Sequence, residues 1–287
     1  MVFEIIAIVV LAILLLYLLA IMPKLKRNPY SKNLDGWLYA HRGLHNNKSE
    51  APENSLPAFK LAVKQGYGIE LDVQLTKDNV PVILHDYHLR RACKEDVIVA
   101  DLTFQELQKY HLFRSKERIP TFEEALAVID GKVPLIIELK IPGNPNRLCK
   151  IVSEILKNYN GIYCIESFNP FGLRWYRLHY PNVVRGQLAS DFIKEKKEGS
   201  KFQYFVLKNM LLNFYTKPDF IAYHHIYKKS LSYTICRKLY HAKTAAWTIK
   251  SQQDYDDNQN CFDLFIFDSF IPEDKKEGGE SLKKIKE

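Results

Sequence analysis

Apolar residues fall in one long run and many short ones. The long run comes first: Val2 to Met22 is 21 residues with Glu4 as its only charged side chain. A helix of that length spans about 30 Å, the thickness of the hydrocarbon core of a bilayer. The pattern therefore predicts one N-terminal transmembrane helix.

The short apolar runs begin at Trp37 and alternate with stretches of helical spacing, which are clearest over 55–66, 146–159 and 230–242. Short runs of this kind are typical of buried strands. The strands predicted in this way are 37–41, 68–74, 134–140, 162–168, 183–188, 219–224, 244–249 and 263–268. Eight alternations of strand and helix predict a parallel (β/α)8 barrel, the TIM barrel of the α/β class.

These patterns divide the chain into four parts: an anchor at 1–22, a polar linker at 23–36, the barrel at 37–271, and a tail at 272–287. The tail has balanced charge and is expected to be disordered. One segment interrupts the barrel pattern, because Val80 to about Ile119 is longer than a simple crossover.

Polar side chains gather where the predicted strands end. Glu70 and Asp72 are two residues apart and share one face of their strand, while Leu71 and Val73 face the other way. Two carboxylates on one face repel each other unless a positive group lies between them. Mg²⁺ and Ca²⁺ prefer oxygen ligands and remove this repulsion, so the pair predicts one divalent metal ion.

Other strand ends add to this group. His41 and Arg42 close the first run, and the run at 80–84 ends at His85. Glu138 and Lys140 also share a direction. Alone they could form a structural ion pair, but beside Glu70 and Asp72 we expect Glu138 to be a third metal ligand. The C-terminal strand ends of a barrel meet on one face, where active sites lie.

Seven short motifs, read together, identify a family. They are HRG at 41–43, PENS at 52–55, ELDV at 70–73, HD at 85–86, ELK at 138–140, SF at 167–168 and WT at 247–248. In this order the chain resembles the membrane-anchored bacterial glycerophosphodiester phosphodiesterases. The resemblance implies a TIM barrel with a small subdomain inserted at about 87–118, over the barrel mouth. It also implies metal-dependent hydrolysis of glycerophosphodiesters to an alcohol and glycerol 3-phosphate.

The resemblance brings in three further candidate site residues. Glu53 lies close to the metal ion in the family, and Asn54 helps to hold the site, while Trp247 ends the seventh barrel strand. For the PENS motif the alternative is structural, because Ser55 is a suitable N-cap and Pro57 suits the first turn of a helix.

The expected chemistry follows from these groups. Arg42 and Lys140 suit phosphate oxygens, and the metal ion supplies further positive charge. His41 and His85 are expected to act as the acid and base pair, because imidazole titrates near neutral pH. Two questions stay open: which histidine is the acid, and whether water or a glycerol hydroxyl attacks first.

One departure from the family pattern lies at the last strand, which ends FIFDS where many members have a Thr-Asp pair. This change, at Asp268, is expected to lie away from the metal cage and not to remove activity.

The charge of the chain is uneven. Of a formal net charge of +8, the stretch 185–229 holds nine basic and four acidic residues. Within it, 205–215 is expected to form one helix with Lys208, Asn209 and Asn213 on a narrow side. That helix either covers barrel strands or lies on an anionic membrane surface, where lipid or lysophospholipid substrates could reach the site. No nucleic-acid recognition motif accompanies the basic residues, so nucleic acid is not expected as a partner.

Flanking charges predict the topology. Lys24, Lys26 and Arg27 follow the long apolar run, and no basic residue precedes it. This favours a single-pass anchor in the cell membrane with a cytoplasmic catalytic domain over a cleaved signal. An odd number of cysteines, five, without CxxC spacing agrees with a reducing compartment.

Three alternative functions remain at this point. They are a phosphatidylinositol-type phospholipase C, a lysophospholipase D-like enzyme, and a membrane-bound binding protein without catalysis. The PENS and ELD motifs with a third carboxylate favour the metal-dependent family over the first, and loss of activity in EDTA would separate the two. The presence of both histidines and all three carboxylates argues against the last.

Overall fold

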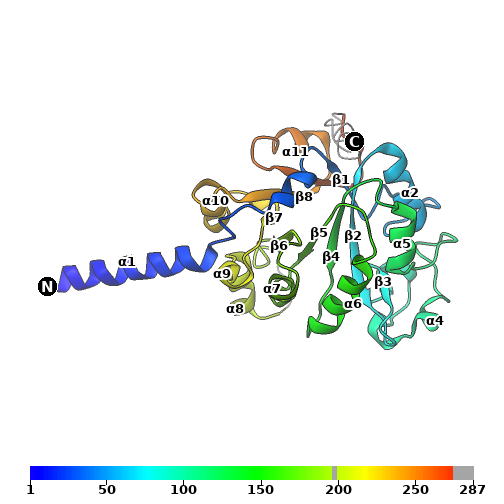
Figure 1. Cartoon of the computed structure of the whole chain (residues 1–287), viewed down its shortest axis with the longest axis horizontal. Coiled ribbons are helices and arrows are strands. Elements are labelled where there is room, and N and C mark those ends of the chain that lie inside the picture. Colours follow the sequence, from blue (N-terminus) through cyan, green and yellow to red (C-terminus); the bar gives the residue numbers. More distant parts are fainter. Residues whose placement is uncertain (196–198, 274–287) are drawn as a thin grey trace.

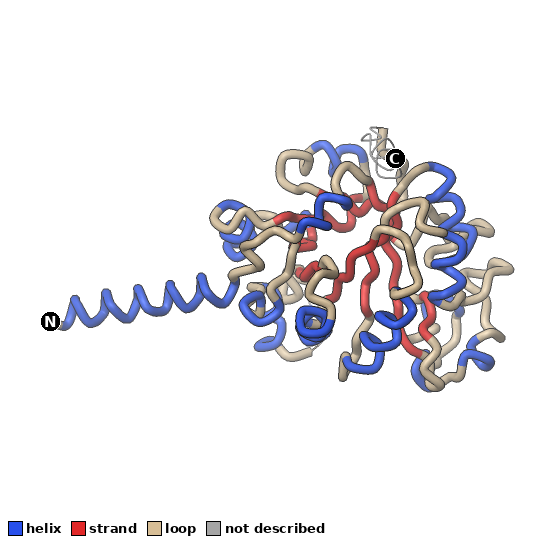
Figure 2. Tube along the Cα trace, in the orientation of Figure 1, coloured by secondary structure: helices blue, strands red, loops and turns tan. Residues whose placement is uncertain are grey.

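The computed structural model describes residues 1–195 and 199–273. A closed barrel forms the body, and one long helix projects from its side (Figure 1). Strands line the inside of the body, and helices surround them (Figure 2). Residues 274–287, most of the predicted tail, lie outside the described residues, as do Lys196 and Lys197 of the basic stretch.

All eight predicted barrel strands are present, and the TIM barrel is confirmed. They are β1 (Leu38–His41), β2 (Gly68–Leu75), β4 (Leu135–Leu139), β5 (Tyr163–Ser167), β6 (Arg185–Ala189), β7 (Phe220–His224), β8 (Lys243–Ile249) and β9 (Leu264–Phe267). Each strand pairs in parallel with the next, and β1 closes the barrel by pairing with both β9 and β2. A ninth strand, β3 (Pro81–Ile83), runs antiparallel to β2.

Strand register brings the acidic side chains together. Asp72 on β2 pairs with Glu138 on β4, and Glu138 pairs in turn with Glu166 on β5. His41 pairs with Glu70 across β1 and β2. His41, Glu138 and Glu166 lie within the last two residues of their strands, at the face that carries active sites in this fold. Glu70 and Asp72 lie at the same level by register, because the end of β2 continues past them to pair with β3.

The helices that cover the barrel are α2 (Leu56–Gln65), α5 (Phe122–Ile129), α6 (Asn146–Leu156), α7 (Pro170–His179), α8 (Lys201–Lys208), α9 (Asn213–Thr216), α10 (Leu231–Lys238) and α11 (Gln252–Asp256). Ser55 caps α2 by accepting from the Ala58 N–H, and Pro57 lies in the first turn. The capping interpretation of Ser55 is thus confirmed. Gly43 is needed beside this helix, because a Cβ there would lie 3.0 Å from Ala58 and its φ is +81°.

The segment after β3 has a small apolar core of its own. It contains α3 (Arg90–Cys93), a 3₁₀ turn (Val99–Asp101) and α4 (Phe104–Leu107). Eight fully buried residues hold it together: Val82, Leu84, Leu89, Ala92, Val99, Leu107, Leu112 and Ile119.

The single helix expected over 205–215 is wrong. α8 ends at Lys208, Met210 takes a φ of +54°, and a separate short helix, α9, starts at Asn213. Asn213 is buried rather than on a polar surface, because its side-chain amide donates to the Ile21 carbonyl at 3.0 Å. Packing against the N-terminal helix therefore determines where this segment breaks.

The N-terminal helix, α1 (Val2–Ile21), is long and apolar enough to cross a membrane. Most of it is exposed, but its last turn packs against α9 and α10 and Ile21 is fully buried. The Tyr240 hydroxyl donates to the Leu18 carbonyl at 2.9 Å, and just beyond the helix Lys24 pairs with Asp219 at 2.8 Å.

Candidate active site

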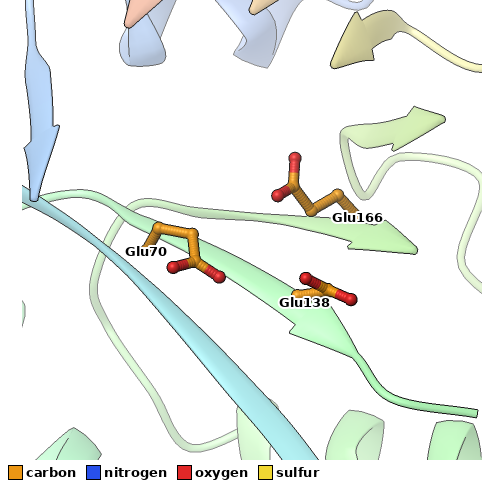
Figure 3. A group of neighbouring side chains, drawn as sticks. All are labelled: Glu70, Glu138 and Glu166. Carbon is orange, nitrogen blue, oxygen red and sulfur yellow. The ribbon is translucent and has the colours of Figure 1, made fainter. Parts of the chain in front are cut away.

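Four buried carboxylates form the centre of the site: Glu70, Asp72, Glu138 and Glu166. One oxygen from each of Glu70, Glu138 and Glu166 lies within 4.8 Å of the others. Figure 3 shows these three side chains on neighbouring strands around one interior space. Glu166 was not predicted from the sequence.

The electrostatics of this group fit a divalent cation. Burial, followed by repulsion from neighbouring carboxylates, raises the pKa of Glu70 and Glu166 well above the usual range. The pKa of Glu138 is also raised, mainly by burial and despite Lys140. The Glu166 Oε2 atom is buried and has no hydrogen-bond partner among the described residues. Clustered oxygen atoms with too little compensating charge are the donor set that Mg²⁺ and Ca²⁺ prefer.

Two cationic side chains, Lys140 and Arg42, lie next to these carboxylates. The Lys140 ammonium lies 2.8 Å from Glu138 Oε1 and 3.3 Å from Asp72 Oδ1. Arg42 Nε lies 3.3 Å from Asp72 Oδ2, and the Arg42 backbone N–H donates to Glu70 at 3.0 Å. Burial opposes ionisation of Asp72, but Lys140 and other cations outweigh it and lower its pKa. Arg42 takes a φ of +57°, the left-handed backbone that often marks functional sites.

His41 is held by an aspartate. Its Nδ1 lies 3.0 Å from Asp268 Oδ2, and its Nε2 lies 3.9 Å from Glu70 Oε2. Burial and the charge of Arg42 lower the pKa of His41 to about 4, although Asp268 opposes them. His45 also contacts Asp268, at 3.2 Å. Asp268 therefore belongs to the site through His41, although it contacts none of the cluster carboxylates. The sequence could not show that the end of β9 meets the end of β1.

His85 is held in the same way. Its Nδ1 lies 2.5 Å from Asp86 Oδ1, and Asp86 accepts a second hydrogen bond from Arg91 at 2.5 Å. Arg91 comes from α3 in the inserted segment and also donates two hydrogen bonds of 2.7 Å to Glu53. The inserted segment thus braces the His85 side of the site.

The remaining candidates are close by. Asn54 donates to Asp72 Oδ2 at 2.8 Å, which agrees with a supporting position. Glu53 lies against Arg42, at 2.6 Å, and against Arg91. Burial opposes its ionisation, but these two cations outweigh it and lower its pKa to about 2. To bind a metal ion, Glu53 would have to give up these contacts.

A cavity of about 880 Å³ opens over the cluster. His85, Glu138 and Lys140 lie along it, and its far wall is aromatic: Phe168, Phe192, Tyr204 and Trp247. Trp247 packs edge-on against Phe168 with ring centres 5.5 Å apart. The site thus joins a charged half to an apolar half.

Glu53 also gives a prediction about acid stability. Its folded pKa is below its ordinary value of 4.5, so its stabilising contribution is complete above pH 4.5 and is lost as pH falls towards 2. We expect Glu53→Gln to lower the free energy of unfolding by about 3 kcal/mol at pH 7 and by almost nothing at pH 2. Urea unfolding across this range, with the exposed Glu123→Gln as control, measures it. A difference that does not depend on pH would contradict this.

Comparison with known proteins gives one family. The model of the glycerophosphoryl diester phosphodiesterase family matches residues 41–263. A glycerophosphodiester phosphodiesterase of Caldanaerobacter subterraneus is 38% identical over 162 residues, which are 52% of this chain and 65% of that protein. A human lysophospholipase D is 35% identical over 134 residues, 42% of this chain and 41% of that protein. The match thus spans less than two thirds of the length of either relative.

Solved structures show the same fold. A phosphodiesterase from Oleispira antarctica, in complex with the product sn-glycerol-3-phosphate, has a TM-score of 0.65 and 24% identity. The match covers 86% of this chain and 96% of that one. A glycerophosphodiester phosphodiesterase from Thermotoga maritima has a TM-score of 0.62 and 21% identity, with coverage of 86% and 98%.

Proposed function

The chain belongs to the glycerophosphoryl diester phosphodiesterase family, and we propose that it hydrolyses glycerophosphodiesters to an alcohol and glycerol 3-phosphate. One observation carries the proposal: two histidines, each held at Nδ1 by an aspartate, stand beside a buried carboxylate cluster crossed by Arg42 and Lys140. The site has the parts that a phosphodiester reaction needs, namely a base, an acid and positive charge for the phosphate oxygens.

His41 and His85 are the acid and base pair in this proposal. With Nδ1 donating to Asp268 or Asp86, the Nε2 atom of each ring is left for the substrate. One imidazole takes a proton from the attacking hydroxyl, and the other gives a proton to the departing alcohol oxygen.

In this proposal Glu70, Asp72 and Glu138 would hold one divalent metal ion, either Mg²⁺ or Ca²⁺, and Glu166, which has an oxygen within 4.8 Å of those of Glu70 and Glu138, would be a further ligand. When bound, the ion offsets their negative charge and stabilises charge that develops on the phosphate. Arg42 contributes a guanidinium suited to phosphate oxygens, and Lys140 adds an ammonium within 3.3 Å of Asp72.

The substrate class follows from both halves of the cavity. A phosphodiester belongs beside His85 and Lys140, and the aromatic wall suits an apolar or cationic alcohol group. The bound product of the Oleispira antarctica enzyme supports a glycerophosphodiester. The name of the human relative, lysophospholipase D, supports a lysophospholipid as a second substrate.

We propose that α1 stays in the mature protein as a membrane anchor. Cleavage of a signal sequence after the apolar run would remove the carbonyls of Leu18 and Ile21, which accept hydrogen bonds from Tyr240 and Asn213. The three basic residues after α1 support a cytoplasmic barrel. The five cysteines, all free, support a reducing compartment.

Activity of the full chain in detergent tests the proposed function. Glycerophosphocholine, glycerophosphoglycerol and a lysophospholipid are offered with Mg²⁺, with Ca²⁺ or with EDTA. Metal-dependent release of glycerol 3-phosphate from the first two substrates supports the proposal. Activity that survives EDTA points to a phospholipase C-like mechanism, and metal binding without turnover of any substrate points to a binding protein.

Asp268→Asn is expected to lower kcat about 100-fold with little change in KM, because the amide holds His41 less well than a carboxylate does. The bond and charge of Asp268 raise the pKa of His41, so their loss lowers that pKa. If His41 is the base, the acid limb of the kcat profile moves to lower pH. Asp256→Asn, on the surface helix α11, is the control. An unchanged kcat and profile would show that Asp268 does not position His41.

Removal of residues 1–22 is expected to destabilise the barrel, because Asn213, Lys217, Cys236 and Tyr240 lose their backbone acceptors. At about 1 kcal/mol for each hydrogen bond, the loss is about 2–4 kcal/mol. A chain that starts at Tyr17 keeps these acceptors and serves as the matched control. Equal stability of the two shortened chains, by thermal unfolding, would contradict this role of the last turn.

A further inference from the structure

The last turn of α1 is part of the barrel wall. Ile21 is fully buried, and its carbonyl accepts from Asn213 of α9 at 3.0 Å and from the Cys236 thiol of α10 at 3.3 Å. Two more contacts fix the neighbouring residues: Tyr240 to Leu18 and Lys217 to the Met22 carbonyl. The barrel is therefore attached to α1 rigidly, not through a free linker.

The length of α1 then sets how close the barrel comes to the membrane. The part free of the barrel, 2–16, is 15 residues and spans about 22 Å at 1.5 Å per residue. A hydrocarbon core is about 30 Å thick. The missing length of about 8 Å corresponds to the docked turn, 17–21, so that turn and the helices around it lie at the boundary of the bilayer.

The helices on this side of the barrel expose large apolar and aromatic side chains. α8, α9 and α10 lie on the side of the barrel from which α1 projects (Figure 1). Phe202 and Phe205 of α8 are 77% and 51% exposed, and Phe214 of α9 is 48% exposed. Leu231 of α10 and Leu239, the residue that follows α10, are both more than half exposed. A group of large apolar side chains exposed on one side of a protein marks a surface that binds a membrane or another molecule.

We propose that the flank formed by α8, α9 and α10 is inserted into the membrane interface, so that α1 holds the barrel on its side against the bilayer. The proposal rests on the proposed function for its anchor, and it adds the surface and its partner. A lipid bilayer fits this flank better than a protein does, because the docked turn of α1 places the flank at that depth.

This pose has a consequence for the active site. Tyr204 of α8 stacks on Phe192 in the cavity wall with ring centres 5.5 Å apart. Phe202 and Phe205 of the same helix are exposed on the outer surface. One helix therefore separates the aromatic half of the cavity from the bilayer, and a lysophospholipid can move from the membrane past α8 into the site.

The first test uses the full chain in vesicles of phosphatidylcholine and phosphatidylglycerol. The double variant Phe202→Asp with Phe205→Asp is compared with Leu61→Asp, an exposed position on α2, which lies away from α1 (Figure 1). We expect kcat/KM for a vesicle-embedded lysophospholipid to fall at least 10-fold in the double variant, with hydrolysis of soluble glycerophosphocholine unchanged. No change in either rate, or an equal fall in both, would overturn the proposal.

A second measurement does not depend on activity, so it separates failure of this proposal from failure of the proposed function. Phe205→Trp and Leu61→Trp are compared in vesicles that contain brominated phosphatidylcholine. Bromine is expected to quench the fluorescence added by Phe205→Trp and not that added by Leu61→Trp. No quenching would overturn the proposal, and self-association of the chain without quenching would instead make the flank an interface between two copies.

Discussion

Glu70→Gln is expected to lower phosphodiesterase activity at least about 1,000-fold, because in the proposed mechanism a metal ion supplies several kcal/mol of charge stabilisation and Glu70 is one of its proposed ligands. The same change should raise the stability of the metal-free protein. Glu70 has a raised pKa in the folded state, so its effect on stability becomes unfavourable as pH rises above its unfolded value of about 4.5. At pH 7 the metal-free wild type carries this unfavourable effect, and the variant does not.

Two measurements check this prediction together. Calorimetric titration with Mg²⁺ and Ca²⁺ reports loss of binding, and thermal unfolding with and without metal reports the reversal in stability. Glu123→Gln, an exposed glutamate of α5, should behave as wild type in both. Full activity of Glu70→Gln, or a fall in its metal-free stability, would show that Glu70 is a structural partner of the Arg42 backbone instead of a ligand.

Glu166 is a residue of the carboxylate cluster that the sequence motifs did not reveal. It precedes the SF motif and ends a strand as Glu138 does, but a single carboxylate in an apolar run has no signal of its own. The register of β4 and β5 places it opposite Glu138. The strand that carries Glu166 was predictable from the sequence. The pairing of β4 with β5, which brings Glu166 into the cluster, forms only when the barrel closes.

Asp268 and Arg91 were missed for a related reason. Each has a partner far away in the chain: Asp268 contacts His41, 227 residues earlier, and Arg91 contacts Glu53, 38 residues earlier. The barrel strands were predictable, because each is a short apolar run of its own. Contacts between the ends of different strands depend on closure of the sheet, which periodicity does not report.

The prediction of one helix over 205–215 is an error of the opposite kind, because the sequence predicted a continuous helix that the fold interrupts. The local pattern of this segment is helical, and the broad apolar face was present in the sequence. The break at Met210 arises because Asn213 turns inward to the carbonyl of Ile21, 192 residues earlier. Tertiary packing overrode local preference at that point, and it did so through the segment that was expected to be only an anchor.

His41→Asn and His85→Asn are each expected to lower kcat for glycerophosphocholine by about 100- to 10,000-fold, with metal binding retained. Because the two rings act in one step in the proposed mechanism, the double variant should lose little more than either single variant. Steady-state kinetics on these three variants measures this, beside His241→Asn, an exposed position that does not line the cavity, as the control. Independent losses that simply multiply would contradict a pair that works as a unit.

A substrate with an activated leaving group then separates the two roles. In a p-nitrophenyl phosphodiester of glycerol the leaving group, p-nitrophenolate, departs as an anion and needs no proton. Loss of the acid should therefore lower kcat little for this substrate, whereas loss of the base should lower kcat as much as it does for glycerophosphocholine. His85 lines the cavity that the aromatic side chains also line, where the alcohol group belongs in the proposal, whereas His41 is partly buried, does not line that cavity and lies 3.9 Å from Glu70. We therefore expect the activated substrate to rescue His85→Asn and not His41→Asn. The opposite result would exchange the two roles, and rescue of neither variant would contradict general acid catalysis by a histidine.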